Sequence, residues 1–175
     1  APDVARHPGL PAAMRIAGSA MFVMPAAGDA GRWRYVAGAN WRHLQGPGSS
    51  TAGRENHPVV HVAYEDALAY ARWLGRELPT EAQWEYAARG GLHAQPHVWG
   101  RDFAPTGKPM ANTWQGPFPL ADMGDDGHRG TSPVGCFAAN GYGLYDMAGN
   151  VWQWTSTWYT PGHSGRPETN PSGPD

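Results

Sequence analysis

Residues 141–159 read GYGLYDMAGNVWQWTSTWY, and they constrain the fold more than any other part of this sequence. The stretch holds three Trp and three Tyr, yet its apolar residues follow neither the period of a helix nor the alternation of a strand. Large aromatic side chains bury much apolar surface and contribute strongly to packing. We therefore expect an ordered but irregular segment that packs through its aromatic side chains.

The composition supports this expectation for the chain as a whole. The 24 Gly and 17 Pro among 175 residues exceed average usage, which alone would favour disorder. The 9 Trp and 7 Tyr argue against disorder, because disordered chains are poor in aromatic residues. The length predicts one domain over residues 1–175, with no internal repeat and little regular secondary structure.

The charge pattern excludes two classes of partner. The net charge is −2 and no run of Lys or Arg is present, so nucleic acid is not an expected partner. No apolar run approaches the roughly 20 residues that span a bilayer, so no membrane partner is expected.

Residues 17–27 are interrupted by Gly18, Ser19 and Pro25, which argues against a signal peptide. Cys136 is the only Cys, which excludes an internal disulfide and fits a reducing, cytoplasmic location.

Short regular elements are predicted in the first half of the chain. Residues 20–24 are a strand candidate, and the run HPVVHVAY at 57–64 predicts a buried strand that leads into a helix. The stretch EDALAYARWLG predicts a helix that ends at Gly75. Its expected buried face consists of Ala67, Tyr70, Ala71 and Leu74.

A second helix is predicted within LPTEAQWEYAARGG, residues 78–91. Thr80 is the expected N-cap, with Gln83 completing a capping box. Gly90 is the expected left-handed stop. The expected buried face consists of Trp84, Ala87 and Ala88. Two short helices beside short strands and many loops predict the α+β class.

Two stretches offer hard oxygen ligands on bending loops. Residues 111–128 carry Asn112, Asp122, Asp125 and Asp126, and residues 146–154 carry Asp146, Asn150 and Gln153. Calcium takes about 6–8 such oxygens, although neither stretch has the EF-hand spacing. The alternative is a pair of solvated turns in which Asp and Asn side chains bond to nearby backbone.

The His and Cys residues indicate no zinc site. His57 and His61 lie four apart on a predicted strand, where that spacing does not form a ligand pair, and no Cys cluster accompanies them. We interpret His61 as a hydrogen-bonded core residue or a supporting neighbour of a site, and His43 as a loop residue that forms hydrogen bonds. Cys136 is expected to be a free thiol in the core, with a reactive thiol as the alternative.

Four long motifs resemble the formylglycine-generating enzymes, the sulfatase-modifying factor family. They are GANWRHLQGPGSS (38–50), HPVVHVAYEDALAYARWLGRELPTEAQWEYAARGGL (57–92), ANTWQGPFP (111–119) and SPVGCFAANGYGLYDMAGNVWQWTSTWY (132–159). The resemblance runs from about Pro8 to Tyr159 and corresponds to the middle of that family's domain. It implies a loop-rich, C-type-lectin-like α+β fold with little regular secondary structure.

The resemblance also implies two structural calcium sites. One would use the Asp146 side chain, the Gly149 and Val151 carbonyls and the Gln153 side chain. The family usually has Glu at the position of Gln153. The other would use Asn112, the Thr113 carbonyl, Asp126 and the His128 carbonyl. Trp152 would face the oxygen and substrate pocket.

The activity implied is oxidation of a Cys in a Cys-x-Pro-x-Arg motif of a sulfatase polypeptide to formylglycine. The family uses O₂ and Cu(I) held by two Cys thiolates, which are soft ligands suited to that ion. We expect that Cys pair to lie outside this chain, in a catalytic segment that follows it. The alternatives are an inactive lectin-like relative that binds peptide or protein partners, and a scaffold related to the sulfoxide synthases of ergothioneine synthesis.

Overall fold

The computed structural model describes residues 5, 7–26, 29–162 and 171. Internal contacts divide the chain into two units, and each unit is built from two separate segments. The first unit comprises Ala1–Val62 and Thr113–Val134, and the second comprises Ala63–Asn112 and Gly135–Asp175. The expectation of a single domain over residues 1–175 stays a prediction.

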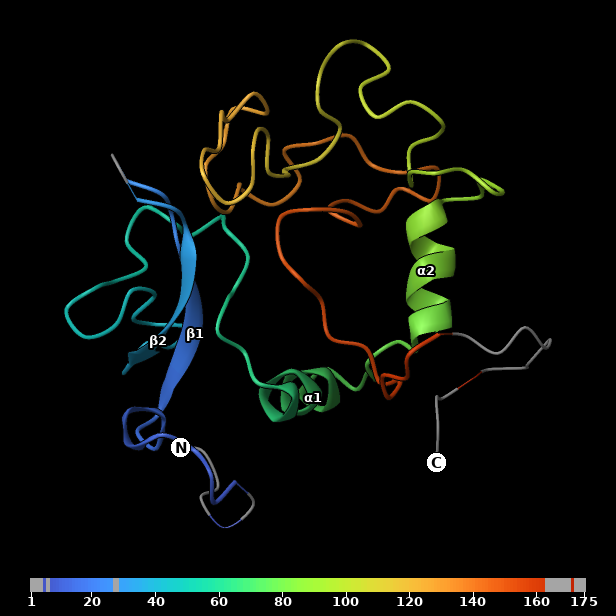
Figure 1. The fold of residues 1–175 in the computed structure, drawn as a ribbon. Coiled ribbons are helices and arrows are strands. Elements are labelled where there is room, and N and C mark those ends of the chain that lie inside the picture. The colour runs from blue at the N-terminus through green and yellow to red at the C-terminus, as the bar shows by residue number, and fades with distance from the viewer. Residues whose placement is uncertain (1–4, 6, 27–28, 163–170, 172–175) are drawn as a thin grey trace. The chain divides into compact units, whose positions relative to one another are not determined.

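The first unit contains a two-stranded antiparallel ribbon, drawn in blue in Figure 1. A short 3-10 helix, η1 (Ala12–Met14), precedes strand β1 (Gly18–Val23), which pairs with β2 (Arg32–Ala37). The register places Gly18 opposite Ala37 and Val23 opposite Arg32. The strand expected at residues 20–24 therefore exists, and it begins two residues earlier than predicted.

Aromatic contacts pack the second segment of this unit, Thr113–Val134, against the two-stranded ribbon. Phe22 meets Trp33 and Trp114 edge to face at centroid separations of 5.6 and 5.7 Å, and it stacks on Phe118 at 5.5 Å. The amide of Gly31 also donates to the Pro119 carbonyl at 2.7 Å. Aromatic contacts thus hold residues 113–119 in place without further sheet pairing.

The strand predicted at residues 57–64 is not formed. Val59 is 67% exposed, and His61 has a left-handed backbone with φ of 59°. The His61 ring contacts the Ser19 hydroxyl through Nδ1 at 2.7 Å and the Leu44 carbonyl through Nε2 at 2.9 Å. A β-branched run needs a neighbouring strand to pair with, and here loop segments take that place.

The second unit carries both helices. Helix α1 (Tyr64–Trp73) begins where the Asp66 carboxylate accepts from the Ala63 amide at 3.2 Å. It ends as predicted at Gly75, whose φ is 66°, with the Arg76 amide donating to the Ala71 carbonyl at 2.8 Å. The predicted buried face is narrower than expected: Ala71 is buried and Ala67 half-buried, whereas Tyr70 and Leu74 are exposed.

Helix α2 (Glu81–Arg89) follows the sequence prediction closely. The Gln83 amide donates to the Thr80 hydroxyl at 3.2 Å, and the Gln83 side chain accepts from the Thr80 amide at 2.9 Å. Gly90 closes the helix in the left-handed region with φ of 56°. Ala88 is buried, and Trp84 and Ala87 are half-buried.

Few large side chains are fully buried in this loop-rich α+β fold. Among the residues that the structure describes, the buried apolar side chains are all alanines, namely Ala39, Ala71, Ala88 and Ala111. The aromatic side chains are half-buried or exposed, so they pack as partly solvated anchors. No helix in the described part is long and apolar enough to cross a membrane.

Candidate functional site

The aromatic segment is irregular, as predicted, and hydrogen bonds attach it to both ends of α2. No helix or strand occurs within residues 141–159. At the C-terminal end of the helix, the Asn140 side chain donates to the Ala87 and Ala88 carbonyls at 2.6 and 3.0 Å. At the N-terminal end, the Glu81 amide donates to the Thr157 hydroxyl at 2.9 Å. Figure 1 shows this orange-to-red segment beside both ends of α2.

Much aromatic surface of this segment faces outward. Trp152 is 94% exposed, Tyr159 88% and Trp158 73%. Trp154 is turned partly inward and meets Tyr64 edge to face at 5.8 Å. Contiguous exposed apolar patches mark surfaces that bind another protein or a ligand. The interpretation of Trp152 as a residue that faces the substrate pocket stays a prediction.

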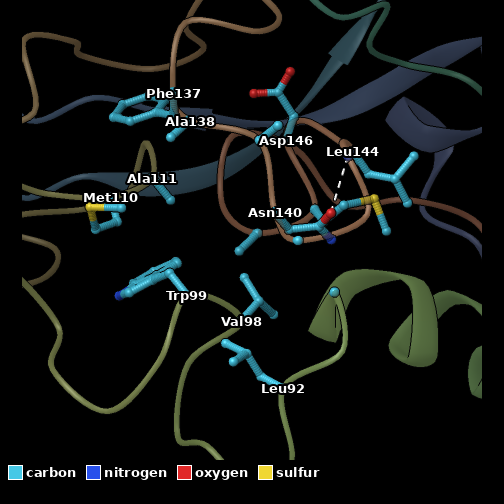
Figure 2. Close-up of a pocket in the computed structure, with 15 residues that line it drawn as sticks. Leu92, Val98, Trp99, Met110, Ala111, Phe137, Ala138, Asn140, Leu144 and Asp146 are labelled. Carbon is cyan, nitrogen blue, oxygen red and sulfur yellow. Dashed lines mark hydrogen bonds between the residues drawn. The ribbon is translucent and has the colours of Figure 1, made fainter.

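A cavity of about 280 Å³ lies in the second unit (Figure 2). Its walls are mainly apolar side chains and glycine backbone, and its polar side chains are Asn140 and Asp146. Figure 2 shows Trp99, Val98 and Leu92 on one side and Phe137 and Ala138 on the other. The Asp146 carboxylate accepts from the Gly135 amide at 2.7 Å. Trp152 is not among the lining residues of this cavity.

Oxygen atoms of residues 113–128 converge on one nitrogen in the first unit. The Asp126 carboxylate accepts from the Thr113 amide at 2.9 Å, from Gln115 Nε2 at 3.0 Å and from the His128 amide at 2.9 Å. The same Gln115 nitrogen donates to the Thr113 carbonyl, and to the Thr113 hydroxyl at 3.1 Å. Two predicted calcium ligands, the Thr113 carbonyl and Asp126, therefore point at a common position.

The other carboxylates of this loop and Asn112 have different surroundings. Asp122 accepts from the Gly124 amide at 3.1 Å, as an Asx turn does. Asn112 belongs to the second unit, where its side chain donates to the Asn150 side chain at 3.3 Å. The backbone N–H of Asn150 donates to the Asn112 carbonyl at 2.8 Å.

Residues 146–153 form a tight loop with three left-handed positions. Asp146, Gly149 and Asn150 have φ values of 54°, 71° and 61°. A Cβ at Gly149 would overlap the Asn112 carbonyl oxygen, so the loop lies directly against that backbone. The Gln153 side chain spans the loop: Nε2 donates to the Asp146 carbonyl at 2.9 Å, and Oε1 accepts from Trp84 Nε1 at 3.0 Å.

His43 and His61 form hydrogen bonds within the fold, and Cys136 lies at the surface. The ring nitrogens of His61 are both hydrogen-bonded, and His43 Nδ1 contacts the Ser49 carbonyl at 2.7 Å, as predicted. Cys136 is exposed, which corrects the expectation of a core thiol, because the short loop that carries it lies at the surface. Within the described ranges, no group of three or more His, Cys, Asp or Glu residues is placed to hold a metal ion.

The sequence of this chain matches a known family. The family model of the sulfatase-modifying factor enzyme 1-like domain matches residues 11–171. The chain belongs to this family. The chain is 54% identical over 142 residues to the formylglycine-generating enzyme of Mus musculus, and 54% identical over 167 residues to that of Mycobacterium tuberculosis. These matches cover 81% and 92% of this chain but 38% and 55% of the relatives.

The family also contains a relative named as inactive. The chain is 51% identical over 130 residues to the inactive C-alpha-formylglycine-generating enzyme 2 of Mus musculus, a match that covers 74% of this chain and 41% of the relative. Among solved structures, Treponema denticola variable protein 1 matches with a TM-score of 0.57 over 91% of this chain and 77% of that one. At 20% identity that likeness concerns the fold alone, and it agrees with the loop-rich fold expected from the sequence.

Sequence reasoning missed the role of Gln115 and the hydrogen bond that Trp84 forms. Gln115 Nε2 donates to oxygens of Thr113 and Asp126, and Trp84 bonds to Gln153 across 69 residues of sequence. Gln115 stands within the motif ANTWQGPFP, so the motif indicated its neighbourhood but not its role. No local sequence pattern indicates the hydrogen bond between Trp84 and Gln153, because hydrogen bonds between distant segments require no fixed spacing of residues in the sequence.

Proposed function

We propose that this chain is part of an oxidase that converts the Cys of a sulfatase Cys-x-Pro-x-Arg motif to formylglycine, with O₂ and Cu(I). Membership of the sulfatase-modifying factor family carries the proposal. The identity of 54% to two enzymes named for this activity supports it. The chain spans between 38% and 55% of the length of such relatives, so the activity concerns the complete protein.

The residues of this chain do not fit a copper site of two thiolates. Cys136 is the only Cys in the sequence. Copper(I) held by two soft sulfur ligands therefore requires thiols that these residues do not supply. This chain therefore supplies the scaffold and the aromatic surface.

The loop of residues 113–128 fits a calcium ion. Its carbonyl and carboxylate oxygens already point at one position, and oxygen ligands of this kind are those that calcium prefers. We propose that calcium is held there by the Thr113 carbonyl and the Asp126 side chain, with the His128 carbonyl. The ion would stabilise the loop by binding only the folded state.

Thermal unfolding in EDTA and in excess calcium tests this site. We expect calcium to raise Tm of the wild type, and Asp126→Asn to abolish the response. Asp122→Asn is the matched control, because Asp122 lies in the same loop but outside the proposed ligand set. Unfolding curves of the wild type that coincide in EDTA and calcium would remove calcium from the proposal.

The exposed aromatic residues are the proposed contact for the substrate polypeptide. Trp152, Trp158 and Tyr159 present a large apolar area in one irregular segment. Aromatic side chains supply much of the energy of peptide recognition at low conformational cost. We expect Trp152→Ala in the complete protein to weaken binding of a Cys-x-Pro-x-Arg peptide. Trp73→Ala, at an exposed position on α1, serves as the control.

A second candidate function is peptide binding without turnover. The 51% identity to a relative named as inactive favours it. The complete protein should be incubated with copper(I), O₂ and a peptide that carries the Cys-x-Pro-x-Arg motif. Capture of a peptide aldehyde by an aminooxy reagent supports the oxidase, and a Ser-x-Pro-x-Arg peptide is the control. Peptide binding with no aldehyde would assign the protein to the binding class.

A further inference from the structure

Gln153 joins helix α2 to the loop of residues 146–153 through a single side-chain amide. Trp84 Nε1, on the helix, donates to Gln153 Oε1 at 3.0 Å. Gln153 Nε2 donates to the Asp146 carbonyl at 2.9 Å, at the other end of the loop. All three residues belong to the second unit.

Each hydrogen-bond partner of the Gln153 amide can only donate or only accept, and this fixes the orientation of the amide. An indole N–H donates and never accepts, whereas a backbone carbonyl accepts and never donates. The oxygen of Gln153 must therefore face Trp84, and its nitrogen must face Asp146. One donor meets one acceptor at each end of the amide, so the hydrogen bonding is balanced.

A carboxylate at position 153 would break this balance. It could accept from Trp84, but its second oxygen would then face the Asp146 carbonyl oxygen, which is also an acceptor. A divalent cation between those oxygens would turn their repulsion into attraction. The N–H₂ group of Gln153 supplies the positive end that such a cation would otherwise provide.

The remaining oxygens of the loop offer a cation little charge. Asp146 is the only carboxylate of the set Asp146, Gly149, Val151 and Gln153, and one of its oxygens accepts from the Gly135 amide. Calcium affinity rises with the number of charged ligands. The residues present therefore do not fit a calcium ion in this loop, because the Gln153 nitrogen faces a single acceptor and bonds to it. Gln115 Nε2, in contrast, faces three oxygens with only two hydrogens.

We propose that the Gln153 amide closes the loop of residues 146–153 in place of a cation. The loop of residues 146–153 folds without calcium and binds none. The proposal concerns metal content and does not rest on the oxidase activity.

Restoring a carboxylate at this position tests the proposal directly. In an Asp126→Asn background, which removes the other proposed site, bound calcium is measured by equilibrium dialysis and elemental analysis. We expect this parent to bind no calcium. Addition of Gln153→Glu should lower Tm in EDTA, create a bound calcium and restore Tm when calcium is added. Gln83→Glu is the matched control, with the same charge change at a residue that keeps its capping acceptor.

Two outcomes would overturn the proposal. The first is calcium bound by the Asp126→Asn parent and lost when Asp146→Asn is added, since the loop would then hold calcium despite Gln153. The second is a Gln153→Glu variant that binds no more calcium than the parent. If neither the wild type nor the parent binds calcium but the Gln153→Glu variant does, the proposal stands and the site at residues 113–128 fails.

A second measurement applies if Gln153→Glu does not fold. The Trp84 indole N–H resonance of the wild type, assigned by comparison with Trp84→Phe, is followed during calcium addition. We expect no shift, because the Gln153 oxygen stays bonded to Trp84. A shift that saturates with calcium and disappears in Asp146→Asn would overturn the proposal.

Discussion

The loops of residues 113–128 and 146–153 each contain a glutamine amide, and the two amides have different surroundings. Gln115 Nε2 has two hydrogens and faces three oxygens: the Thr113 carbonyl, the Thr113 hydroxyl and the Asp126 carboxylate. Gln153 has one donor at its oxygen and one acceptor at its nitrogen. The Gln115 nitrogen therefore faces more acceptors than it has hydrogens, whereas the Gln153 amide has one partner at each end.

This difference shows what decides whether a loop needs a metal ion. A buried or half-buried oxygen without a donor destabilises the folded state, and a cation can satisfy several such oxygens at once. A loop whose acceptors already have donors gains less from a cation and must give up hydrogen bonds to bind one. The hydrogen-bond partners of each glutamine amide thus distinguish the two loops.

The largest expected effect comes from the backbone of the loop of residues 146–153. Gly149→Ala would place a Cβ on the Asn112 carbonyl oxygen at a left-handed φ of 71°. We expect a loss of about 2–5 kcal/mol in the free energy of unfolding, from left-handed strain and overpacking together. Urea unfolding measures it.

Gly127→Ala is the matched control in the other loop. Gly127 has φ of 90°, and a Cβ there would meet no atom within 4 Å. Only the backbone strain remains, so we expect about 1–2 kcal/mol. Equal losses at the two glycines would show that the loop of residues 146–153 is not held as tightly as the structure indicates.

A pair of Gln→Met changes sharpens the comparison. Met keeps the length of the side chain and removes the amide. Gln153→Met leaves the Trp84 N–H and the Asp146 carbonyl without their partner, and should cost about 1–3 kcal/mol in EDTA and in calcium alike. Gln115→Met should lower the free energy of unfolding by a similar amount in EDTA only, because calcium can bind the Thr113 and Asp126 oxygens to which the amide had donated. Thermal unfolding in both buffers distinguishes the two.

The comparison would fail if calcium rescued both Met variants or neither. Rescue of Gln153→Met would mean that the loop of residues 146–153 takes a cation once the amide is gone. Absence of rescue at Gln115 would mean that its oxygens do not form a cation site.

The smallest expected effect is at the other end of the Gln153 amide. Trp84→Phe keeps most of the aromatic packing but removes the N–H that donates to Gln153. We expect a loss of about 0.5–1.5 kcal/mol, the net value of one such hydrogen bond. Trp73→Phe on α1 is the control, because Trp73 is largely exposed and should show almost no change in urea unfolding. Equal results for the two variants would remove the Trp84 bond from the explanation of loop closure.

Sequence reasoning was right where a structural feature depends on neighbours in the chain. The capping box of Thr80 and Gln83 and the stops at Gly75 and Gly90 occur as predicted. Each of these features is formed by backbone and side-chain groups within five residues of one another, so its pattern can be recognised in the sequence. The α+β class and the family followed from the same kind of local reading and from long motifs.

It was wrong where burial and pairing depend on distant segments. The β-branched run at residues 57–64 found no strand to pair with, and Leu74 and Cys136 lie at the surface. A periodic pattern shows which face of an element could be buried. It does not show whether another segment covers that face.

By itself, then, the sequence determined the family, the two helices with their caps, and the irregular aromatic segment, because all of these follow from local patterns and ordered motifs. Only the tertiary structure decided what the two loop glutamines do. Gln115 meets the carboxylate of Asp126, eleven residues away, and Gln153 meets Trp84, 69 residues away. An amide acts as donor or acceptor according to the group that faces it, and folding alone brings those groups together.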